Sequence, residues 1–103
     1  MPAFNAAKTL PLVYRQIPKK LVHEILLVDD GSKDNTVKVS RRLKIKTIIH
    51  KKNLGYGANQ KTCYKYALKQ KVDFIIMLHP DGQYDPHDIS KFINAYKSNH
   101  TDL

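Results

Sequence analysis

Three short apolar runs stand out in a chain that is otherwise rich in charged and polar residues. They span Glu24–Asp29, Ile45–His50 and Asp73–Leu78, and large aliphatic or aromatic side chains dominate each of them. None alternates cleanly between apolar and polar positions, which is typical of strands that are covered on both faces. We therefore expect three buried β-strands at these positions.

Helical spacing fills the stretches between these runs. Asn35–Leu43 places Val39 and Leu43 four residues apart, with Asp34 or Asn35 as the N-cap. Gly57–Gln70 has one side made of Cys63, Tyr66, Ala67 and Gln70 and another made of Lys61, Lys65 and Lys69. These two segments are predicted to be helices that connect the strands.

The first and last helices are marked by prolines. A helix from about Ala6 to Ile17 accommodates Pro11 only near its first turn, and Pro18 ends it. Asp85-Pro86 opens the last helix, because proline is favoured at the first helical position. The inward face of that helix is formed at 3.6-residue spacing by Ile89, Phe92, Ile93 and Tyr96.

Alternation of helices and strands predicts the architecture. Such an order favours βαβ units, a parallel sheet and an α/β fold with helices on both faces. Met1–Phe4 has the pattern of the end of a further strand, so we expect a three-layer α/β/α Rossmann-like sheet whose first strand is truncated. Residues 1–103 then form a single, partial domain.

Charge is unevenly distributed along the 103 residues, which carry 18 Lys and Arg against 9 Asp and Glu, a formal net charge of +9. No acidic residue occurs from Asn35 to Val72, and the aspartates gather around Asp29-Asp30 and around Asp81. A solvated lysine-rich surface explains this segregation, as does an anionic membrane surface or a phosphorylated ligand. Nucleic acid is a further alternative, because a pI of about 9.7 exceeds the usual threshold.

Cellular location follows from what the chain lacks. Cys63 is the only cysteine, which excludes an internal disulfide, and Met1 is not followed by a charged and then apolar leader. We expect a cytoplasmic domain, with peripheral attachment at the inner face of the membrane as an alternative. His23, His50, His87 and His100 show no metal-ligand spacing, and we interpret them as surface or strand-end residues.

Candidate chemistry lies where the strands end, since ligands of parallel sheets bind outside the carboxyl ends of the strands. Asp30 follows one strand and Asp81 follows another. Two carboxylates facing one crevice repel each other unless a cation is shared, which suggests a divalent metal. The alternatives are a turn and helix-cap role for Asp30 and an ordinary Asp-Gly turn at Asp81-Gly82.

The ordered set of loops resembles family 2 glycosyltransferases of the GT-A fold, in the branch of dolichyl-phosphate and other polyprenyl-phosphate sugar synthases. The resemblance spans nearly the whole chain. It rests on four motifs in the family's order: Pro2-Ala3-Phe4-Asn5, Ile25–Ser32 with Asp34 and Thr36, Lys52–Gly57, and Met77–Pro86.

The resemblance implies a role for each matching position. Pro2 and Phe4 line the base and ribose pocket, Val28 and Asp30 form the base-contacting strand end, and Asp30 accepts a hydrogen bond from the base. Asp81 matches the last aspartate of the family's DxD motif and binds the metal, Mn²⁺ or Mg²⁺, with Gln83 nearby. The loop that would run beside the nucleotide contains Lys52, Asn53 and Gly55.

Two positions depart from the family pattern. His79 stands where DxD has its first aspartate, followed by Pro80, and imidazole is a poor ligand for Mg²⁺ although it binds Mn²⁺. His79 therefore binds the metal or instead hydrogen-bonds the ribose or a phosphate, beside Pro80 in the nucleotide site. Ala6 replaces an acidic residue that contacts the nucleotide.

The implied reaction is inverting transfer of a sugar from a nucleotide-diphosphate sugar to a polyprenyl phosphate or a saccharide. In the family, the catalytic base and the acceptor site come from sequence that would follow Leu103. We therefore expect the chain to bind nucleotide without turnover, and its exposed sheet edges to favour self-association. The alternatives are a non-catalytic nucleotide-sugar-binding module and a basic nucleic-acid-binding domain.

Overall fold

A three-stranded parallel sheet forms the centre of the computed structural model, which describes residues 1–72, 75–81 and 88–100. The strands are β1 (Pro2–Ala3), β2 (Leu26–Asp29) and β3 (Lys46–Ile49), in the spatial order β1-β2-β3. Pro2 pairs with Val28 across β1 and β2, and Leu26 pairs with Lys46 across β2 and β3. All three carboxyl ends therefore lie at one end of the sheet.

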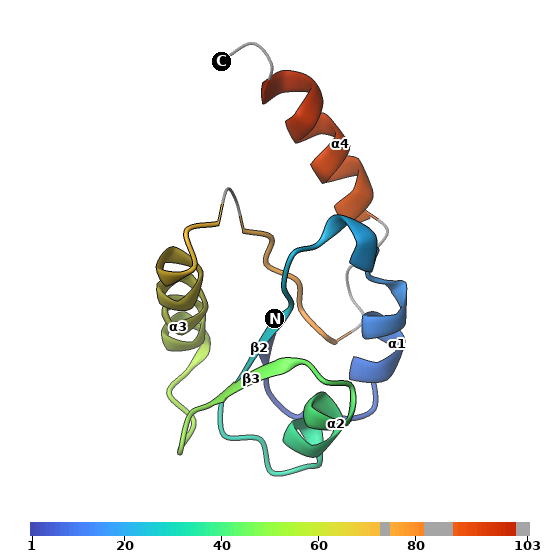
Figure 1. The fold of residues 1–103 in the computed structure, drawn as a ribbon. Helices are drawn as coiled ribbons and strands as arrows, with labels where there is room; N and C mark the ends of the chain where they lie inside the picture. The colour runs from blue at the N-terminus through green and yellow to red at the C-terminus, as the bar shows by residue number, and fades with distance from the viewer. Residues whose placement is uncertain (73–74, 82–87, 101–103) are drawn as a thin grey trace.

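Helices cover both faces of this sheet, which confirms the α/β/α architecture. They are α1 (Leu10–Gln16), the short 3-10 helix η1 (Lys19–Leu21), α2 (Thr36–Arg42), α3 (Tyr56–Lys69) and α4 (Asp88–His100). The pair α1 and α2 lies on one side of the sheet and α3 on the other, while α4 projects away from the sheet (Figure 1).

Local sequence explains where α1 begins and ends. It starts at Leu10, later than the predicted Ala6, and Pro11 occupies its first turn, where a missing backbone N–H costs no hydrogen bond. Ile17 leaves the helical conformation immediately before Pro18, as proline requires of the residue that precedes it.

Apolar side chains from both ends of the chain form one core. Leu10 of α1 and Leu27 of β2 are completely buried, and Ile89 and Ile93 of α4 pack into the same cluster, as predicted for the inward face of that helix. The side chains of Phe92 and Tyr96, predicted for the same face, lie outside the described part of the chain.

The strand predicted at Asp73–Leu78 is wrong for residues 75–78, which belong to no strand, while residues 73–74 lie outside the described ranges. The physical reason why these residues do not pair with β1 is the direction in which its backbone N–H and C=O groups point, since successive residues of a strand point to opposite edges. The carbonyl of Met1 accepts from the N–H of Val28 in β2, and the carbonyl of Ala3 accepts from the N–H of Asp30 just after it, so the backbone of Pro2 faces the opposite edge of β1. Proline has no N–H to donate there, and β1 is too short to offer a further donor within the strand.

The expectation that the second apolar run is covered on both faces is also wrong. β3 is an edge strand of the sheet; Lys46 and Ile49 at its two ends are exposed, Ile49 with an exposed fraction of 43%, and the two residues between them are half-buried. An edge strand has a neighbour on one side only, so its last residues remain in contact with solvent.

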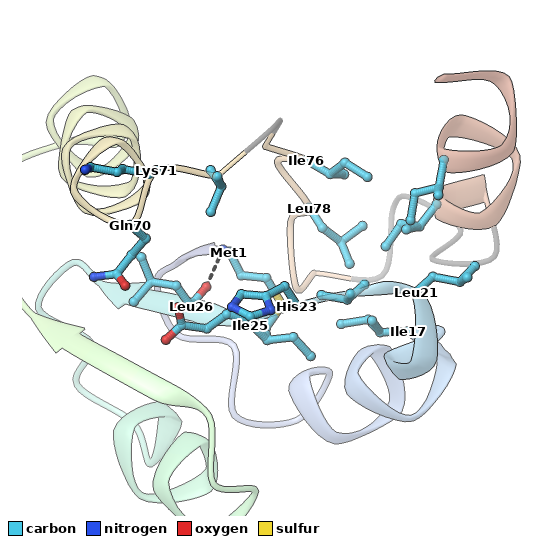
Figure 2. Close-up of a pocket in the computed structure, with 15 residues that line it drawn as sticks. Met1, Ile17, Leu21, His23, Ile25, Leu26, Gln70, Lys71, Ile76 and Leu78 are labelled. Carbon is cyan, nitrogen blue, oxygen red and sulfur yellow. Dashed lines mark hydrogen bonds between the residues drawn. The ribbon is translucent and has the colours of Figure 1, made fainter. Parts of the chain in front are cut away.

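An apolar groove of about 420 Å³ opens at the amino ends of the strands, between β2, the end of α1 and α4. Figure 2 shows its walls, which include the side chains of Ile17, Ile25, Ile76 and Leu78. At one side of the groove the amino group of Met1 donates a hydrogen bond to the carbonyl of Leu26. We call this hollow the amino-end groove.

Candidate functional site

Polar side chains tie the loop after β1 to the loop after β2 at the carboxyl end of the sheet. The backbone N–H of Asn5 donates to Oγ of Ser32 at 2.8 Å, and Oδ1 of Asn5 accepts from the N–H of Lys33 at 2.9 Å. Asn5 has φ of 51°, in the left-handed region that asparagine tolerates better than most residues. The chain can therefore turn sharply after Ala3 and present Phe4.

Asp34 reinforces the same junction from the start of α2. One of its carboxylate oxygens accepts from the N–H and hydroxyl of Thr36, and the other accepts from the N–H of Ala7 at 3.1 Å. Burial alone would raise the pKa of Asp34, but the hydrogen bonds from Thr36 and Ala7 outweigh it and hold the pKa below its ordinary value. Of the two predicted N-cap candidates, Asn35 is the N-cap of α2, and Asp34 bonds the first residue of the helix from the position before Asn35.

A cavity of about 310 Å³ lies between these loops, at the carboxyl ends of the strands. We call it the carboxyl-end cavity. The residues that line it are Pro2, Ala3, Phe4, Ala6, Asp30, Asn53, Gly55, Tyr56, Asn59, His79, Pro80 and Asp81. They come from the ends of β1 and β2, the loop before α3, the start of α3, and the loop around residue 80.

Most of the site residues predicted from the sequence lie together in this cavity. The predicted nucleotide-binding positions found there are Pro2, Phe4, Asp30, Asn53, Gly55, His79 and Pro80, together with the predicted metal ligand Asp81. Val28 does not line it, because its side chain is completely buried, and exposed Lys52 does not line it either. Gln83 lies outside the described residues.

Asp30 is a buried polar side chain of the cavity, with an exposed fraction of 4%, and it is held by three hydrogen bonds. Oδ1 accepts from the N–H of Leu54 at 2.8 Å and contacts Nδ1 of His50 at 3.0 Å, while Oδ2 accepts from the N–H of Gly55 at 2.9 Å. Burial raises the pKa of Asp30, but the bonds from Leu54, His50 and Gly55 overcome this and lower it below the ordinary value. Asp30 is therefore a carboxylate at neutral pH.

Two glycines make the close approach of these loops possible. A side chain at Gly31 would place its Cβ 2.8 Å from the backbone nitrogen of Asn53, which is closer than real Cβ contacts allow. Gly55 has open space around it but a φ of 97°, a conformation that favours glycine. Gly31 thus brings the loop before α3 against the end of β2, and Gly55 lets the chain turn into α3.

Tyr56 and His79 build one wall of the cavity. Their rings stack with centroids 5.2 Å apart, and the hydroxyl of Tyr56 lies 2.9 Å from Nε2 of His79. The sequence predictions missed Tyr56 and also Asn59, whose amide donates to the carbonyl of Val28 at 2.8 Å. Both lie at helical spacing before Cys63, which is buried. Extending the predicted side of this helix that contains Cys63 towards the amino end would have found them.

Metal-binding chemistry at this site is limited to a few donors. Asp81 and His79 line the same cavity, and in the part of the chain that the structure describes no three histidine, cysteine or acidic side chains gather around one point. A carboxylate and an imidazole form part of a coordination sphere that suits Mn²⁺ better than Mg²⁺. Oxygens from a bound substrate would have to complete it.

The lysines and arginines of the acid-free part of the sequence are exposed on α2, β3, α3 and the adjoining loops, on both sides of the sheet. These basic side chains make no ion pair with any described residue. They are Lys38, Arg41, Arg42, Lys44, Lys46, Lys51, Lys52, Lys61, Lys65, Lys69 and Lys71.

None of the helices in the described ranges is long and apolar enough to cross a bilayer.

Comparison with known proteins gives consistent matches. The sequence model of glycosyl transferase family 2 matches residues 1–103. The UDP-N-acetylglucosamine--dolichyl-phosphate N-acetylglucosaminyltransferase of Methanococcus voltae is 32% identical over 110 residues, covering 90% of this chain and 44% of that protein. The polyprenol monophosphomannose synthase of Mycolicibacterium smegmatis is 26% identical over 103 residues, covering 92% of this chain and 38% of that protein. The chain thus spans less than half the length of these relatives.

Proposed function

This chain belongs to glycosyl transferase family 2, and on that premise we propose that it binds the nucleotide-diphosphate sugar of an inverting glycosyltransferase. The observation that carries the proposal is the carboxyl-end cavity, which gathers residues from the ends of β1 and β2, the loop between β3 and α3, the start of α3 and residues 79–81. In open α/β sheets this is the position where nucleotides bind.

The nucleoside would lie between the ends of β1 and β2. Phe4 has an exposed fraction of 48% and lines the cavity, so its ring offers an apolar face to a base. Asp30 accepts three hydrogen bonds from the protein, and a carboxylate has about four acceptor positions. One position on Oδ2 is left for an N–H of the base or a hydroxyl of the ribose.

The diphosphate would face the start of α3. This helix has 14 residues and no acidic side chain in its first turn, and both Gly55 and Tyr56 line the cavity. A helix amino terminus combines unpaired N–H groups with the positive end of the helix dipole, which favours a bound anion.

Members of this family generally use a divalent metal, and the donors in the cavity fit a partial site for one. Asp81 would hold the cation together with diphosphate oxygens, and His79 is a second donor for Mn²⁺. When bound, such a cation stabilises the negative charge that develops on the leaving nucleoside diphosphate.

For the acceptor, the names of two relatives favour a polyprenyl phosphate over a saccharide. A lipid phosphate is already an anion at neutral pH, so its attack on the anomeric carbon, with inversion, needs no general base. Such an acceptor lies in a bilayer, and the exposed lysines and arginines of the acid-free segment support binding to anionic lipid headgroups at about 1 kcal/mol for each one that comes near the membrane. We propose that the domain contacts an anionic membrane surface and that it self-associates through the open edge of β3.

The test is a titration of the chain with UDP and with GDP, each in Mn²⁺ and in EDTA, and with a single-stranded oligonucleotide at two salt concentrations. We expect one nucleoside diphosphate to bind, more tightly in Mn²⁺. Phe4→Ala should weaken that binding about tenfold through loss of stacking on the base, and Leu12→Ala, at an exposed position of α1, should leave it unchanged.

Two results would contradict the proposal. Salt-sensitive binding of the oligonucleotide without binding of either diphosphate would instead identify a nucleic-acid-binding domain. Equal effects of Phe4→Ala and Leu12→Ala would mean that the nucleotide binds elsewhere. Acceptor-dependent release of nucleoside diphosphate from a sugar nucleotide then separates a transferase from a non-catalytic binding module.

A further inference from the structure

His50 lies just outside the carboxyl-end cavity and connects three elements. It follows β3, where its backbone N–H donates to the carbonyl of Asp29 at 2.8 Å. Its side chain, with an exposed fraction of 10%, bridges the carboxylate of Asp30 at Nδ1 and the hydroxyl of Thr62 in α3 at Nε2, the latter at 2.9 Å. His50 thus links the end of β2 to helix α3.

The bonding partners determine which ring nitrogen carries the proton. A carboxylate only accepts, so Nδ1 of His50 must donate to Asp30. In the neutral ring, Nε2 then accepts the hydroxyl proton of Thr62. In the doubly protonated ring, Nε2 donates to Thr62 Oγ1, and the Thr62 hydroxyl turns to the carbonyl of Ala58, which is 3.1 Å away. The Nδ1–H bond to Asp30 is present in both cases.

Because of this bond, the two carboxylate oxygens of Asp30 differ in the number of acceptor positions that remain open. Oδ1 has both acceptor positions occupied, by His50 and by the N–H of Leu54. Oδ2 accepts only from the N–H of Gly55. The carboxylate therefore cannot rotate about its Cβ–Cγ bond without breaking a bond to His50, and the remaining acceptor position stays on Oδ2.

We propose that His50 is a positioning residue for the donor nucleotide, acting through Asp30. It fixes the orientation in which Asp30 offers Oδ2 to an N–H or O–H group of the nucleoside, and it holds Leu54 and Gly55 in place at the start of α3. This inference rests on the proposed function, because it names the residue that prepares that nucleotide site.

The experiment compares binding of the preferred nucleoside diphosphate in Mn²⁺ for five forms of the chain. They are the wild type, His50→Ala, His50→Asn, Asp30→Asn and the double variant His50→Ala with Asp30→Asn. Asparagine can place an amide N–H near the position of Nδ1, so His50→Asn keeps the donor to Asp30. His23→Ala, at an exposed histidine beside the amino-end groove, is the matched control.

We expect His50→Ala to weaken binding about tenfold, through loss of one charge-assisted hydrogen bond. His50→Asn should stay within about threefold of the wild type, and the double variant should bind no more weakly than Asp30→Asn, because both changes remove the same interaction. His23→Ala should bind like the wild type.

A second readout needs no ligand. Nitrogen NMR of the wild type should show His50 in the Nδ1–H tautomer when neutral, whereas a histidine in water favours Nε2–H. Amide hydrogen exchange at Leu54 and Gly55 should accelerate in His50→Ala and not in His23→Ala.

Several outcomes overturn the inference. Wild-type affinity in His50→Ala, additive losses in the double variant, or an Nε2–H tautomer would each remove the positioning role while leaving the proposed function intact. If the wild type binds no nucleoside diphosphate at all, the proposed function fails, and the inference built on it fails as well.

Discussion

The two hollows at opposite ends of the sheet differ in chemistry far more than in size. The amino-end groove has about 420 Å³ and the carboxyl-end cavity about 310 Å³. Eight of the core or core-packing side chains, such as Ile17 and Leu78, line the larger groove. The smaller cavity contains a carboxylate with three hydrogen bonds, a stacked Tyr56–His79 pair and the start of α3.

This difference follows from the direction of the strands. At the carboxyl ends, the chain leaves β1 and β2 through loops whose side chains bond to one another, so polar groups are held at fixed positions. At the amino ends, apolar residues of β2 and α4 face each other, and the buried ammonium of Met1 donates to the carbonyl of Leu26 at 2.6 Å. Burial lowers the pKa of that ammonium. Volume alone therefore does not identify the site of chemistry.

The largest effect is expected from a change in the groove. Ile89→Ala removes a buried side chain of α4 and should lower the free energy of unfolding by about 2–4 kcal/mol, while nucleotide affinity stays within about twofold of the wild type. Urea unfolding and nucleotide titration measure the two quantities. Leu68→Ala, at a position of α3 with an exposed fraction of 74%, is the control and should cost less than about 0.5 kcal/mol.

If Ile89→Ala weakened nucleotide binding as strongly as it lowered stability, the groove and the cavity would not be independent. The contrast between an apolar supporting region and a polar binding region would then be lost.

Asp81→Ala should show the opposite pattern. The side chain is exposed at the rim of the cavity, so the free energy of unfolding should change by less than about 0.5 kcal/mol. Affinity for the nucleoside diphosphate should fall at least about tenfold in Mn²⁺, since a metal ligand is lost, and hardly at all in EDTA. Equal losses under both conditions would exclude a metal-binding role for Asp81.

His79→Asp should produce a smaller, selective change. It supplies a second carboxylate and should shift the preference from Mn²⁺ towards Mg²⁺ by about three- to tenfold, because Mg²⁺ prefers oxygen ligands. The ratio of nucleotide dissociation constants in the two metals measures this. His23→Asp makes the same substitution beside the amino-end groove and should leave the ratio as it is; an unchanged ratio in His79→Asp would place His79 outside the coordination sphere.

The smallest expected effect is the contribution of Asp30 to the change of the unfolding free energy with pH. Its pKa in the folded state is lower than the ordinary value of 3.8, so its bonds stabilise the fold fully above that value. The stabilisation is lost as the pH falls through the folded-state pKa. Unfolding free energies of the wild type, measured from pH 5 down to pH 2, should therefore decrease at pH values below about 4, and those of Asp30→Asn should fall less steeply. Identical slopes would show that other carboxylates account for the acid sensitivity.

The sequence by itself determined the elements whose formation depends on local pattern. The apolar runs predicted β2 and β3, prolines bounded α1, and the spacing of Ile89 and Ile93 predicted the buried face of α4. The convergence of Phe4, Asp30 and Asp81 on one cavity was also predictable, since parallel strands place their carboxyl ends together.

Tertiary structure alone decided the features that depend on a partner distant in sequence. Residues 75–78 have the composition of a strand but stay outside the sheet, and the free edge of β1 is short and presents Pro2, which has no N–H to donate. His50 looked like an isolated strand-end histidine. Its partners Asp30 and Thr62 lie 20 and 12 residues away, and only the packing of α3 against the end of the sheet brings them within hydrogen-bonding distance.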